Sequence, residues 1–281
     1  MTGRIIRFLI PLLIVNIFLL IKLFGVDVTQ QHEIRILSYN IRHGEGMDKR
    51  IDLKRIAEVI SKTNPDLIAL QEVDKNCERS GKIDIALELG AMLGMESRFG
   101  KFMEFQGGEY GMAVLSKFPI INSRRIELPE GKKEPRCALE IVVQPEASSS
   151  PVSFICIHND WIDETARVAQ IKALLDAIND VKHPIILAGD FNGEMSDNSM
   201  QILLKEDWNI LDKNGQKTYP SQESSVEIDF IVTYGFQSAT FECDIINEQI
   251  ASDHRPISAV ILFQDEQNNE EQSDIIEDIR E

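Results

Sequence analysis

Polar side chains stand at the ends of several apolar stretches of this chain. The uncharged run 184–188 ends in Gly189-Asp190-Phe191-Asn192, so a carboxylate and an amide follow a segment typical of a strand buried on both faces. Asp190 and Asn192 occupy alternate positions, so both side chains can point to the same side of the strand end. Capping of the following turn is the structural alternative, and one such motif does not decide between the two.

The same arrangement recurs along the chain. A strand predicted over Ile34–Asn40 ends in an amide, one over Asp66–Glu72 ends in a carboxylate, and one over Val152–His158 ends in an imidazole. The polar residues at or within such strands are Asn40, Glu72, His158, Asp190, Asn192, Asp229, Asp253 and His254. Burial of such groups costs free energy unless they serve partners or ligands, so we expect them to form one site.

Oxygen donors dominate this set of residues, and no thiolate belongs to it. Carboxylate and amide oxygens suit a hard cation, Mg²⁺ or Mn²⁺, whose coordination is completed by substrate oxygens and water. Two histidines beside carboxylates supply acid/base and charge-stabilising groups. Together these groups predict metal-assisted hydrolysis of a phosphoester.

Further helices and strands are expected between these strand ends. Apolar residues at helical spacing predict helices over 51–63, 83–93, 163–179 and 196–205. Short apolar or alternating runs predict strands over 111–115, 120–128, 137–143, 226–232 and 257–263. The sequence therefore predicts one folded domain that mixes helices and strands, without an internal repeat.

Several short motifs follow one another in a fixed order between residues 34 and 263. They are Ser38-Tyr39-Asn40, Leu70-Gln71-Glu72-Val73, Gly111–Pro119, His158-Asn159-Asp160, Gly189-Asp190-Phe191-Asn192, Ile228-Asp229-Phe230-Ile231 and Ser252-Asp253-His254-Arg255-Pro256. In this order they resemble the motifs of the endonuclease/exonuclease/phosphatase superfamily, the fold of DNase I, although any one alone would be weak. The resemblance implies an α+β protein, a four-layer α/β/β/α sandwich with one active site at the sheet edge.

The resemblance also implies which residues bind the metal. Glu72 would be the principal ligand, with Asn40 beside it. Asp253 would be a further ligand or a carboxylate close to the metal.

The remaining motif residues would carry the acid/base chemistry. Asp229 would orient His254, and this pair would act jointly with Asp190 to activate water in line with the scissile bond. Asp190 and Asn192 would hold the nucleophile and a phosphate oxygen. His158 would stabilise charge on the pentavalent phosphorus.

Three residues outside this core are candidates for substrate contacts. Tyr110 directly precedes the Gly111 motif, and we expect it either to hydrogen-bond a phosphate oxygen or to pack in the core. Arg79 and Arg136 are candidates for binding substrate anions, with an ordinary surface role as the alternative.

The net charge of −17 narrows the class of substrate. A surface this acidic repels a phosphate backbone, so tight sequence-independent DNA binding is disfavoured. The Trp-rich basic surface of abasic-site nucleases is absent, as is the inositol polyphosphate 5-phosphatase pattern before Asp229. We therefore expect a phosphodiesterase or phosphatase for a lipid head group or small phosphoester. A secreted or membrane-anchored nuclease is the alternative enzyme.

A membrane-tethered binding module without catalysis is the alternative from another class. Such a degenerate domain would have lost a catalytic group. The chain retains Glu72, His158, Asp190 and His254, which favours an enzyme.

The two ends of the chain differ from its middle. Residues 1–26 contain Arg4 and Arg7 followed by the fourteen uncharged residues Phe8–Ile21, which indicates an export signal that contacts the membrane through residues 5–24. No Ala-x-Ala site follows, which favours a signal anchor over a cleaved signal peptide, with a buried N-terminal helix as the alternative. The basic flank predicts that the catalytic domain, residues 27–263, lies outside the cytoplasm, anchored or secreted. We expect this domain to be monomeric. The acidic tail 264–281 is expected to be disordered.

The four cysteines form no metal-binding pattern. Cys77, Cys137, Cys156 and Cys243 show no Cys-x-x-Cys spacing and are expected to be buried small residues. Cys137 and Cys156 lie in candidate neighbouring strands, so a disulfide between them stays open.

Overall fold

Two six-stranded mixed sheets face each other in the computed structural model, which describes residues 31–146, 148, 150–236 and 238–264. The first sheet has the order β11 (Thr240–Ile245), β12 (Ile257–Gln264), β1 (Gln31–Asn40), β2 (Leu67–Lys75), β4 (Gly108–Ser116), β3 (Glu96–Phe105). The second has the order β5 (Ile120–Glu127), β6 (Cys137–Val143), β7 (Val152–His158), β8 (Ile185–Asp190), β10 (Asp229–Tyr234), β9 (Asn209–Ile210).

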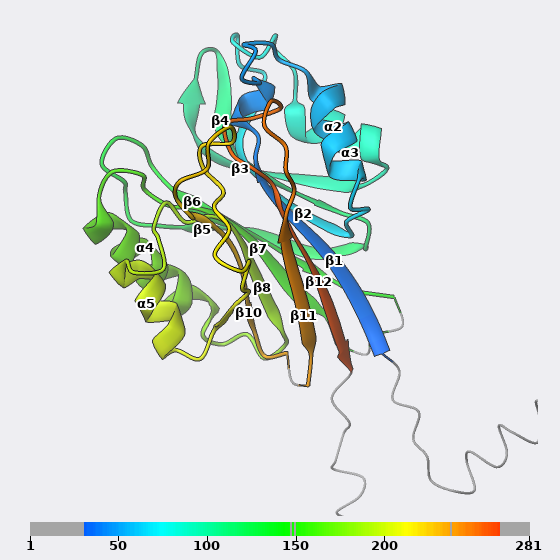
Figure 1. Cartoon of the computed structure of the whole chain (residues 1–281), viewed down its shortest axis with the longest axis vertical. Coiled ribbons are helices and arrows are strands. Elements are labelled where there is room, and N and C mark those ends of the chain that lie inside the picture. Colours follow the sequence, from blue (N-terminus) through cyan, green and yellow to red (C-terminus); the bar gives the residue numbers. More distant parts are fainter. Residues whose placement is uncertain (1–30, 147, 149, 237, 265–281) are drawn as a thin grey trace, which may run out of the picture. The chain divides into compact units, whose positions relative to one another are not determined.

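Two pairs of helices cover the outer faces of these sheets. They are α2 (Leu53–Ser61) with α3 (Ile85–Leu93), and α4 (Glu164–Ile178) with α5 (Asn198–Lys205). The first pair lies on one outer side of the strands and the second pair on the other (Figure 1). The predicted four-layer α/β/β/α sandwich is confirmed.

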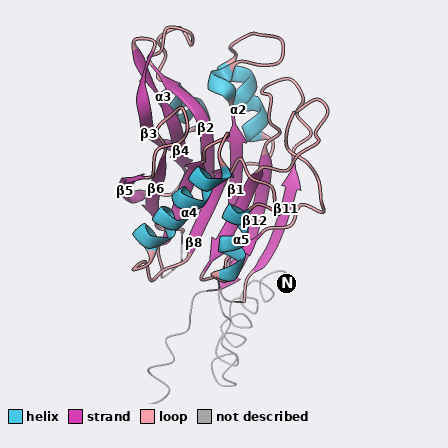
Figure 2. Cartoon of the chain, turned by 90° about the vertical axis from the view of Figure 1, so that its left-hand side faces the viewer, coloured by secondary structure: helices cyan, strands magenta, loops and turns pink. Residues whose placement is uncertain are grey.

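Alternation of side chains along the strands creates separate core layers. In β1, Ile34 and Ile36 pack between the two sheets, whereas Leu37 and Tyr39 pack in the layer that contains the buried residues of α2 and α3. This division follows from the two-residue period of a strand. A third layer joins the other face of the second sheet to α4 and α5, which lie in front of its strands in Figure 2. Both faces of the central strands are therefore buried, as their apolar sequences predicted.

The helices begin at aspartate residues. The side chains of Asp52, Asp84 and Asp163 accept hydrogen bonds from backbone N–H groups in the first turns of α2, α3 and α4. These N-caps satisfy donors that have no partner within the helix. The predicted helices are thus present, each a few residues shorter than its apolar pattern.

Three strands of the structure have no counterpart in the sequence prediction. They are β3, β9 and β11. The residues of β11 alternate between exposed and half-buried, and most of those in β3 are only half-buried. A strand with so little fully buried surface has a weak apolar pattern, which explains why these strands were missed.

All four cysteines are free thiols. Cys156 on β7 faces Leu139 rather than Cys137 on the neighbouring strand β6. The disulfide left open between Cys137 and Cys156 is therefore absent. Cys77, Cys137 and Cys156 are buried as predicted, whereas Cys243 on the edge strand β11 is only half-buried, so the prediction is wrong for this residue.

The predicted membrane segment, residues 5–24, lies outside the described residues, as does the acidic tail apart from Gln264, which ends β12. Among the described residues, no helix has the length and apolar character needed to cross a membrane. The division into residues 1–26, 27–263 and 264–281 stays a prediction.

Gly189 allows β8 to pack closely against β7. A Cβ atom at this position would overlap the backbone oxygen of Ile157. We expect Gly189→Ala to lower the free energy of unfolding by about 1–3 kcal/mol, because a central strand cannot move aside without loss of packing. Urea unfolding measures the loss. Gly193→Ala is the control, because its added Cβ would meet side-chain atoms only, the nearest at 3.1 Å, and an equal loss in both variants would contradict the explanation.

Candidate active site

The predicted strand ends meet at one edge of the sandwich, where they form a cleft of about 570 Å³. Parallel pairing of β1 with β2 and of β7 with β8 brings their carboxyl ends to the same edge. The predicted residues that line the cleft are Glu72, Arg79, Tyr110, Arg136, His158, Asp190, Asn192, Asp253 and His254. Asn40 and Asp229 contact this group through hydrogen bonds to Glu72, Asp190 and His254. The structure thus places all eleven predicted site residues in or directly beside one cleft.

Asp190 lies at the centre of the polar contacts. Its Oδ2 accepts a hydrogen bond from Asn40 Nδ2 at 3.1 Å, and its Oδ1 accepts one from the backbone N–H of Asn192 at 2.9 Å. The Nε2 atoms of His158 and His254 lie 3.6 Å and 3.7 Å from Oδ2. Burial, together with the nearby Asp229 carboxylate, raises the pKa of Asp190 to about 7. A carboxyl group with this pKa is suited to accept a proton near neutral pH.

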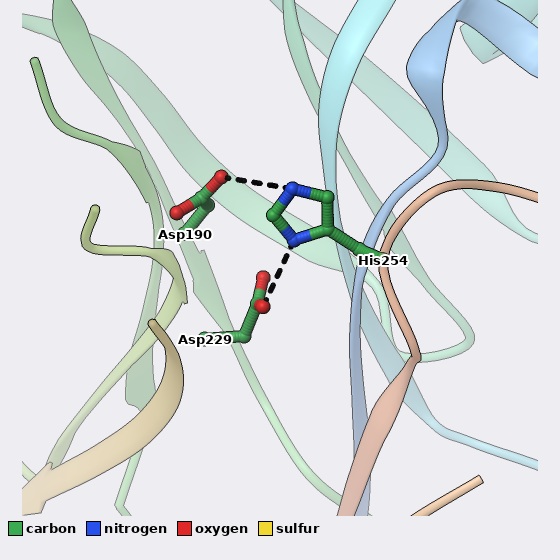
Figure 3. Close-up of side chains that lie close together, drawn as sticks. All are labelled: Asp190, Asp229 and His254. Carbon is green, nitrogen blue, oxygen red and sulfur yellow. Dashed lines mark hydrogen bonds and ion pairs between the residues drawn. The ribbon is translucent and has the colours of Figure 1, made fainter. Parts of the chain in front are cut away.

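Asp229 holds His254 by a hydrogen bond between Oδ2 and Nδ1 at 3.0 Å (Figure 3). Thr218 fixes the start of β10, since its Oγ1 accepts from the backbone N–H groups of Ile228 and Asp229. Burial alone would lower the pKa of His254, but the carboxylates of Asp229 and Asp190 raise it to about 10. His254 is therefore a cation at neutral pH, and its hydrogen bond to Asp229 is the contact that the family resemblance implies.

In the metal-free protein, we expect Asp229→Asn to lower the pKa of His254 toward its ordinary value of about 6.5, because the variant loses the carboxylate that stabilises the imidazolium. Long-range ¹H–¹⁵N NMR of the imidazole nitrogens between pH 5 and pH 11 measures the titration. Since the folded-state pKa is raised, the stabilisation by His254 is complete below about pH 6.5 and is lost as pH rises through about 10. His183, whose pKa burial lowers, is the internal control. An unchanged His254 titration in the variant would refute this assignment.

His158 differs from His254 in charge. Burial, followed by the positive charges of Arg136 and His254, lowers the pKa of His158 well below its ordinary value. The imidazole is consequently neutral, and it can stabilise phosphoryl charge as an uncharged hydrogen-bond donor.

A β-bulge aims Glu72 into the cleft. The register of β2 against β4 shifts between Leu70 and Val73, and Glu72 has the left-handed backbone angle φ of 57°. Bulges and left-handed residues often re-aim side chains at functional sites. Asn40 Nδ2 donates to Glu72 Oε1 at 3.1 Å, which holds the carboxylate in place.

Glu72, Asn40 and Asp253, here called the Glu72 group, have the chemistry of a divalent-cation site. Burial, followed by the charge of Asp253, raises the pKa of Glu72, and a bound cation would relieve both effects. Asn40 Oδ1 already accepts from the backbone N–H of Arg42 at 3.2 Å, but a carbonyl oxygen has a second lone pair. The donor set of two carboxylates and one amide oxygen fits Mg²⁺ or Mn²⁺.

A second group with ligand geometry is formed by Asp190, Asp229 and His254, whose candidate ligand atoms all lie within 4.8 Å of one another. His254 Nδ1 is already hydrogen-bonded to Asp229. The protonated imidazole has no free lone pair and repels a cation. The Glu72 group therefore fits the cation better while His254 is charged.

Arg136 and Arg79 are not ordinary surface arginines. Arg136 is only 2% exposed, Nη1 donates to Glu134 at 2.8 Å, and Nε is buried without a hydrogen-bond partner among the described residues. Arg79 is held by two hydrogen bonds to the buried Asp74, at 2.8 Å and 2.7 Å. Both residues line the cleft, and a guanidinium group has the charge and geometry to pair with an anion.

Tyr110 packs in the core as one of its two expected roles, and its contact with a phosphate oxygen stays a prediction. Its ring packs against Phe102 and Phe105 at centroid distances of 5.8 Å and 6.1 Å, and it also lines the cleft. Burial, followed by the charge of Glu72, raises its pKa well above the ordinary value. The phenol is therefore neutral and can donate a hydrogen bond.

Several cleft residues were not predicted from the sequence. They are Met103, Phe105, Glu134, Trp161, Tyr219, Val226 and Ile228. Trp161 directly follows the His158-Asn159-Asp160 motif, and this adjacency was a usable signal. Tyr219 lies in a stretch without a motif or clear periodicity, so the sequence offered no signal for it.

Fold and site together define a phosphoester hydrolase architecture, and the chain belongs to the endonuclease/exonuclease/phosphatase family, whose sequence profile matches residues 37–254. The uncharacterized protein YbhP of Escherichia coli K12 is 24% identical over 250 residues, which cover 84% of this chain and 98% of YbhP. A conserved protein of unknown function from Enterococcus faecalis V583 has a similar structure, with a TM-score of 0.69, 22% identity, and coverage of 82% of this chain and 100% of that chain. The mannosyl-6-phosphatase Bt3783 of Bacteroides thetaiotaomicron has a TM-score of 0.65, 17% identity, and the same two coverages.

Proposed function

We propose that the protein is a divalent-metal-dependent phosphoester hydrolase that acts by in-line attack of activated water on phosphorus. One observation carries this proposal. A continuous set of polar contacts runs from Asp229 through His254 and Asp190 to Asn40 and Glu72. It combines a base with a pKa near neutral, a cation and an oxygen-rich metal group in one cleft.

We assign each residue of the cleft a separate role in the reaction. Glu72, Asn40 and Asp253 would hold Mg²⁺ or Mn²⁺, which when bound supplies positive charge to the phosphoryl oxygens. Asp190 orients the attacking water and accepts its proton. His254, oriented by its hydrogen bond to Asp229, donates to a phosphoryl oxygen.

Three further side chains assist the transfer. His158 donates to the phosphoryl group as a neutral imidazole, and Arg136 contributes charge from the buried wall of the cleft. Asn192 donates through Nδ2 to the backbone oxygen of Asn159 at 3.0 Å, which leaves its Oδ1 to position the water.

Two observations support a small phosphoester or a lipid head group as the substrate. The net charge of −17 disfavours a polyanionic nucleic acid, which weakens the nuclease alternative. A protein of similar fold is described as a mannosyl-6-phosphatase, a name that denotes a small phosphomonoester. The basic and apolar sequence of residues 1–26 supports action outside the cytoplasm, anchored to the membrane or secreted.

Hydrolysis of p-nitrophenyl phosphate and bis-p-nitrophenyl phosphate by the purified full-length chain tests the proposal. We expect turnover with Mg²⁺ or Mn²⁺ and none with EDTA, and the preferred compound separates a monoesterase from a diesterase. Glu72→Ala and His254→Ala should remove the activity, whereas Glu58→Gln, at an exposed position on α2, should retain it. If the two cleft variants hydrolyse both compounds like the wild type, the proposal is wrong.

A further inference from the structure

Two exposed aromatic rings line the cleft. Trp161 is 54% exposed and Tyr219 is 37% exposed. In the second sheet, β8 lies between β7 and β10 and ends at Asp190. Trp161 follows β7, whereas Tyr219 precedes β10, so the segments that carry the two rings connect to the strands on either side of β8, and both rings line the same cleft as Asp190.

The loop that carries Trp161 is fixed by a buried carboxylate. Asp160 is 1% exposed, and its Oδ1 accepts from the backbone N–H groups of Ile162 and Asp163 at 2.9 Å and 2.7 Å. Its Oδ2 accepts from the backbone N–H of Lys132 at 2.8 Å, which ties the loop to the segment before β6. Trp161 is therefore presented to solvent by an ordered loop, as expected for a binding residue set in place before the ligand arrives.

Each ring leaves surface for a ligand. Lys133 Nζ lies 5.2 Å from the Trp161 ring centroid, and with this contact Trp161 is still 54% exposed. The Tyr219 ring packs 4.7 Å from the ring of His254, so it stands directly beside the catalytic imidazole. By contrast, Trp208, the second tryptophan of the chain, is only 6% exposed. A ligand ring stacked on Trp161 would bury apolar surface of this side chain that is now exposed to solvent.

The cleft has room for more than a phosphoryl group. Its volume of about 570 Å³ lies in the range of pockets that enclose a whole small molecule. We propose that Trp161 and Tyr219 form a stacking subsite for the leaving group, and that the substrate is the phosphoester of a ring compound, either a sugar or a nucleobase-bearing group. This inference rests on the proposed phosphoester hydrolase function and adds the chemical class of the leaving group.

Phenylphosphonate and methylphosphonate provide a matched pair of probes, because they share a phosphonate that cannot be hydrolysed and differ in the ring. In a Trp208→Phe background, Trp161 is the single fluorescent tryptophan. We expect phenylphosphonate to change its emission, with a dissociation constant up to about tenfold lower than that of methylphosphonate. Circular dichroism confirms that the variant is folded.

Substitutions then distinguish the loss of ring stacking from a general change in the structure of the cleft. Trp161→Ala should raise the inhibition constant of phenylphosphonate up to about tenfold and leave that of methylphosphonate unchanged, while Trp161→Phe restores most of the difference. Ile162→Ala, at an exposed neighbour outside the cleft, should change neither constant. Ratios of kcat/KM for a hexose 6-phosphate and a nucleoside 5′-monophosphate, each relative to glycerol phosphate, distinguish a sugar from a nucleobase as the stacked ring.

These experiments test the stacking subsite and the proposed hydrolase function separately. Equal affinity for both phosphonates, or an equal effect of Trp161→Ala on both, overturns the stacking subsite while metal-dependent hydrolysis stands. Ring-dependent binding without metal-dependent hydrolysis of any phosphoester overturns the proposed function but retains an aromatic ligand site.

Discussion

Asp190→Asn lowers kcat by about 10²- to 10⁴-fold, the range that a positioned general base contributes. Asparagine keeps the size of the side chain, and its Oδ1 can still accept from the backbone N–H of Asn192. The variant loses the carboxylate that would take a proton from water, together with the negative charge beside His254 and the Oδ2 acceptor of the Asn40 hydrogen bond. Steady-state kinetics with p-nitrophenyl phosphate at saturating Mg²⁺ measure the loss, and KM should change far less than kcat.

The pH profile gives a second readout of the same substitution. In the wild type, kcat rises with pH through an apparent pKa of about 7 or lower, since burial raises the pKa of Asp190 and a bound cation lowers it again. The acidic limb should disappear in Asp190→Asn. Asp176→Asn, at an exposed position on α4, is the matched control and should keep both rate and profile. An Asp190→Asn enzyme with an intact acidic limb would assign the base to another group.

Glu72→Gln weakens the binding of Mn²⁺ and lowers kcat at subsaturating metal by about 10²- to 10³-fold, because the site loses the charge of its principal carboxylate. Calorimetric titration with Mn²⁺ measures binding without any need for turnover. The left-handed backbone at Glu72 is unchanged by the substitution, so the bulge should persist. Glu58→Gln should bind Mn²⁺ like the wild type.

Metal binding by the second group, Asp190, Asp229 and His254, would contradict the prediction for Glu72→Gln. If Mn²⁺ affinity is unchanged in Glu72→Gln but lost in Asp229→Asn, the cation lies among Asp190, Asp229 and His254. That result would also remove the imidazolium from the mechanism, because a metal-bound imidazole must be deprotonated.

Local sequence patterns predicted the central strands because these strands are buried on both faces and read as apolar runs. The motifs also predicted the side chains of the cleft, and His158 and Asp190 end β7 and β8 as expected, whereas β2 continues past Glu72 to Lys75 and Glu72 lies at the bulge within the strand. The edge strands β3 and β11 could not be predicted in this way, because their side chains are mostly exposed or half-buried.

The contacts within the site depend on properties that no short pattern encodes. The bulge at Glu72 arises from the pairing of β2 with β4, so it follows from long-range register and not from local composition. The burial of Arg136 results from the packing of its segment around Phe102 and Glu134. Tyr219 and His254 are 35 residues apart in the chain, and they are in contact only because the fold brings their two segments together.

The hydrogen bond from Asn40 Nδ2 to Asp190 Oδ2 joins a side chain of the first sheet to a side chain of the second sheet. Gln71 makes a similar connection, since its Nε2 contacts Ser38 Oγ in its own sheet and Cys156 Sγ in the other, both at 3.3 Å. The proposed metal-binding residues and the proposed base thus belong to different sheets, and sliding of one sheet over the other would pull them apart. The proposed activity should therefore depend on the alignment of the two sheets, and a ligand that contacts residues of both sheets should raise the melting temperature.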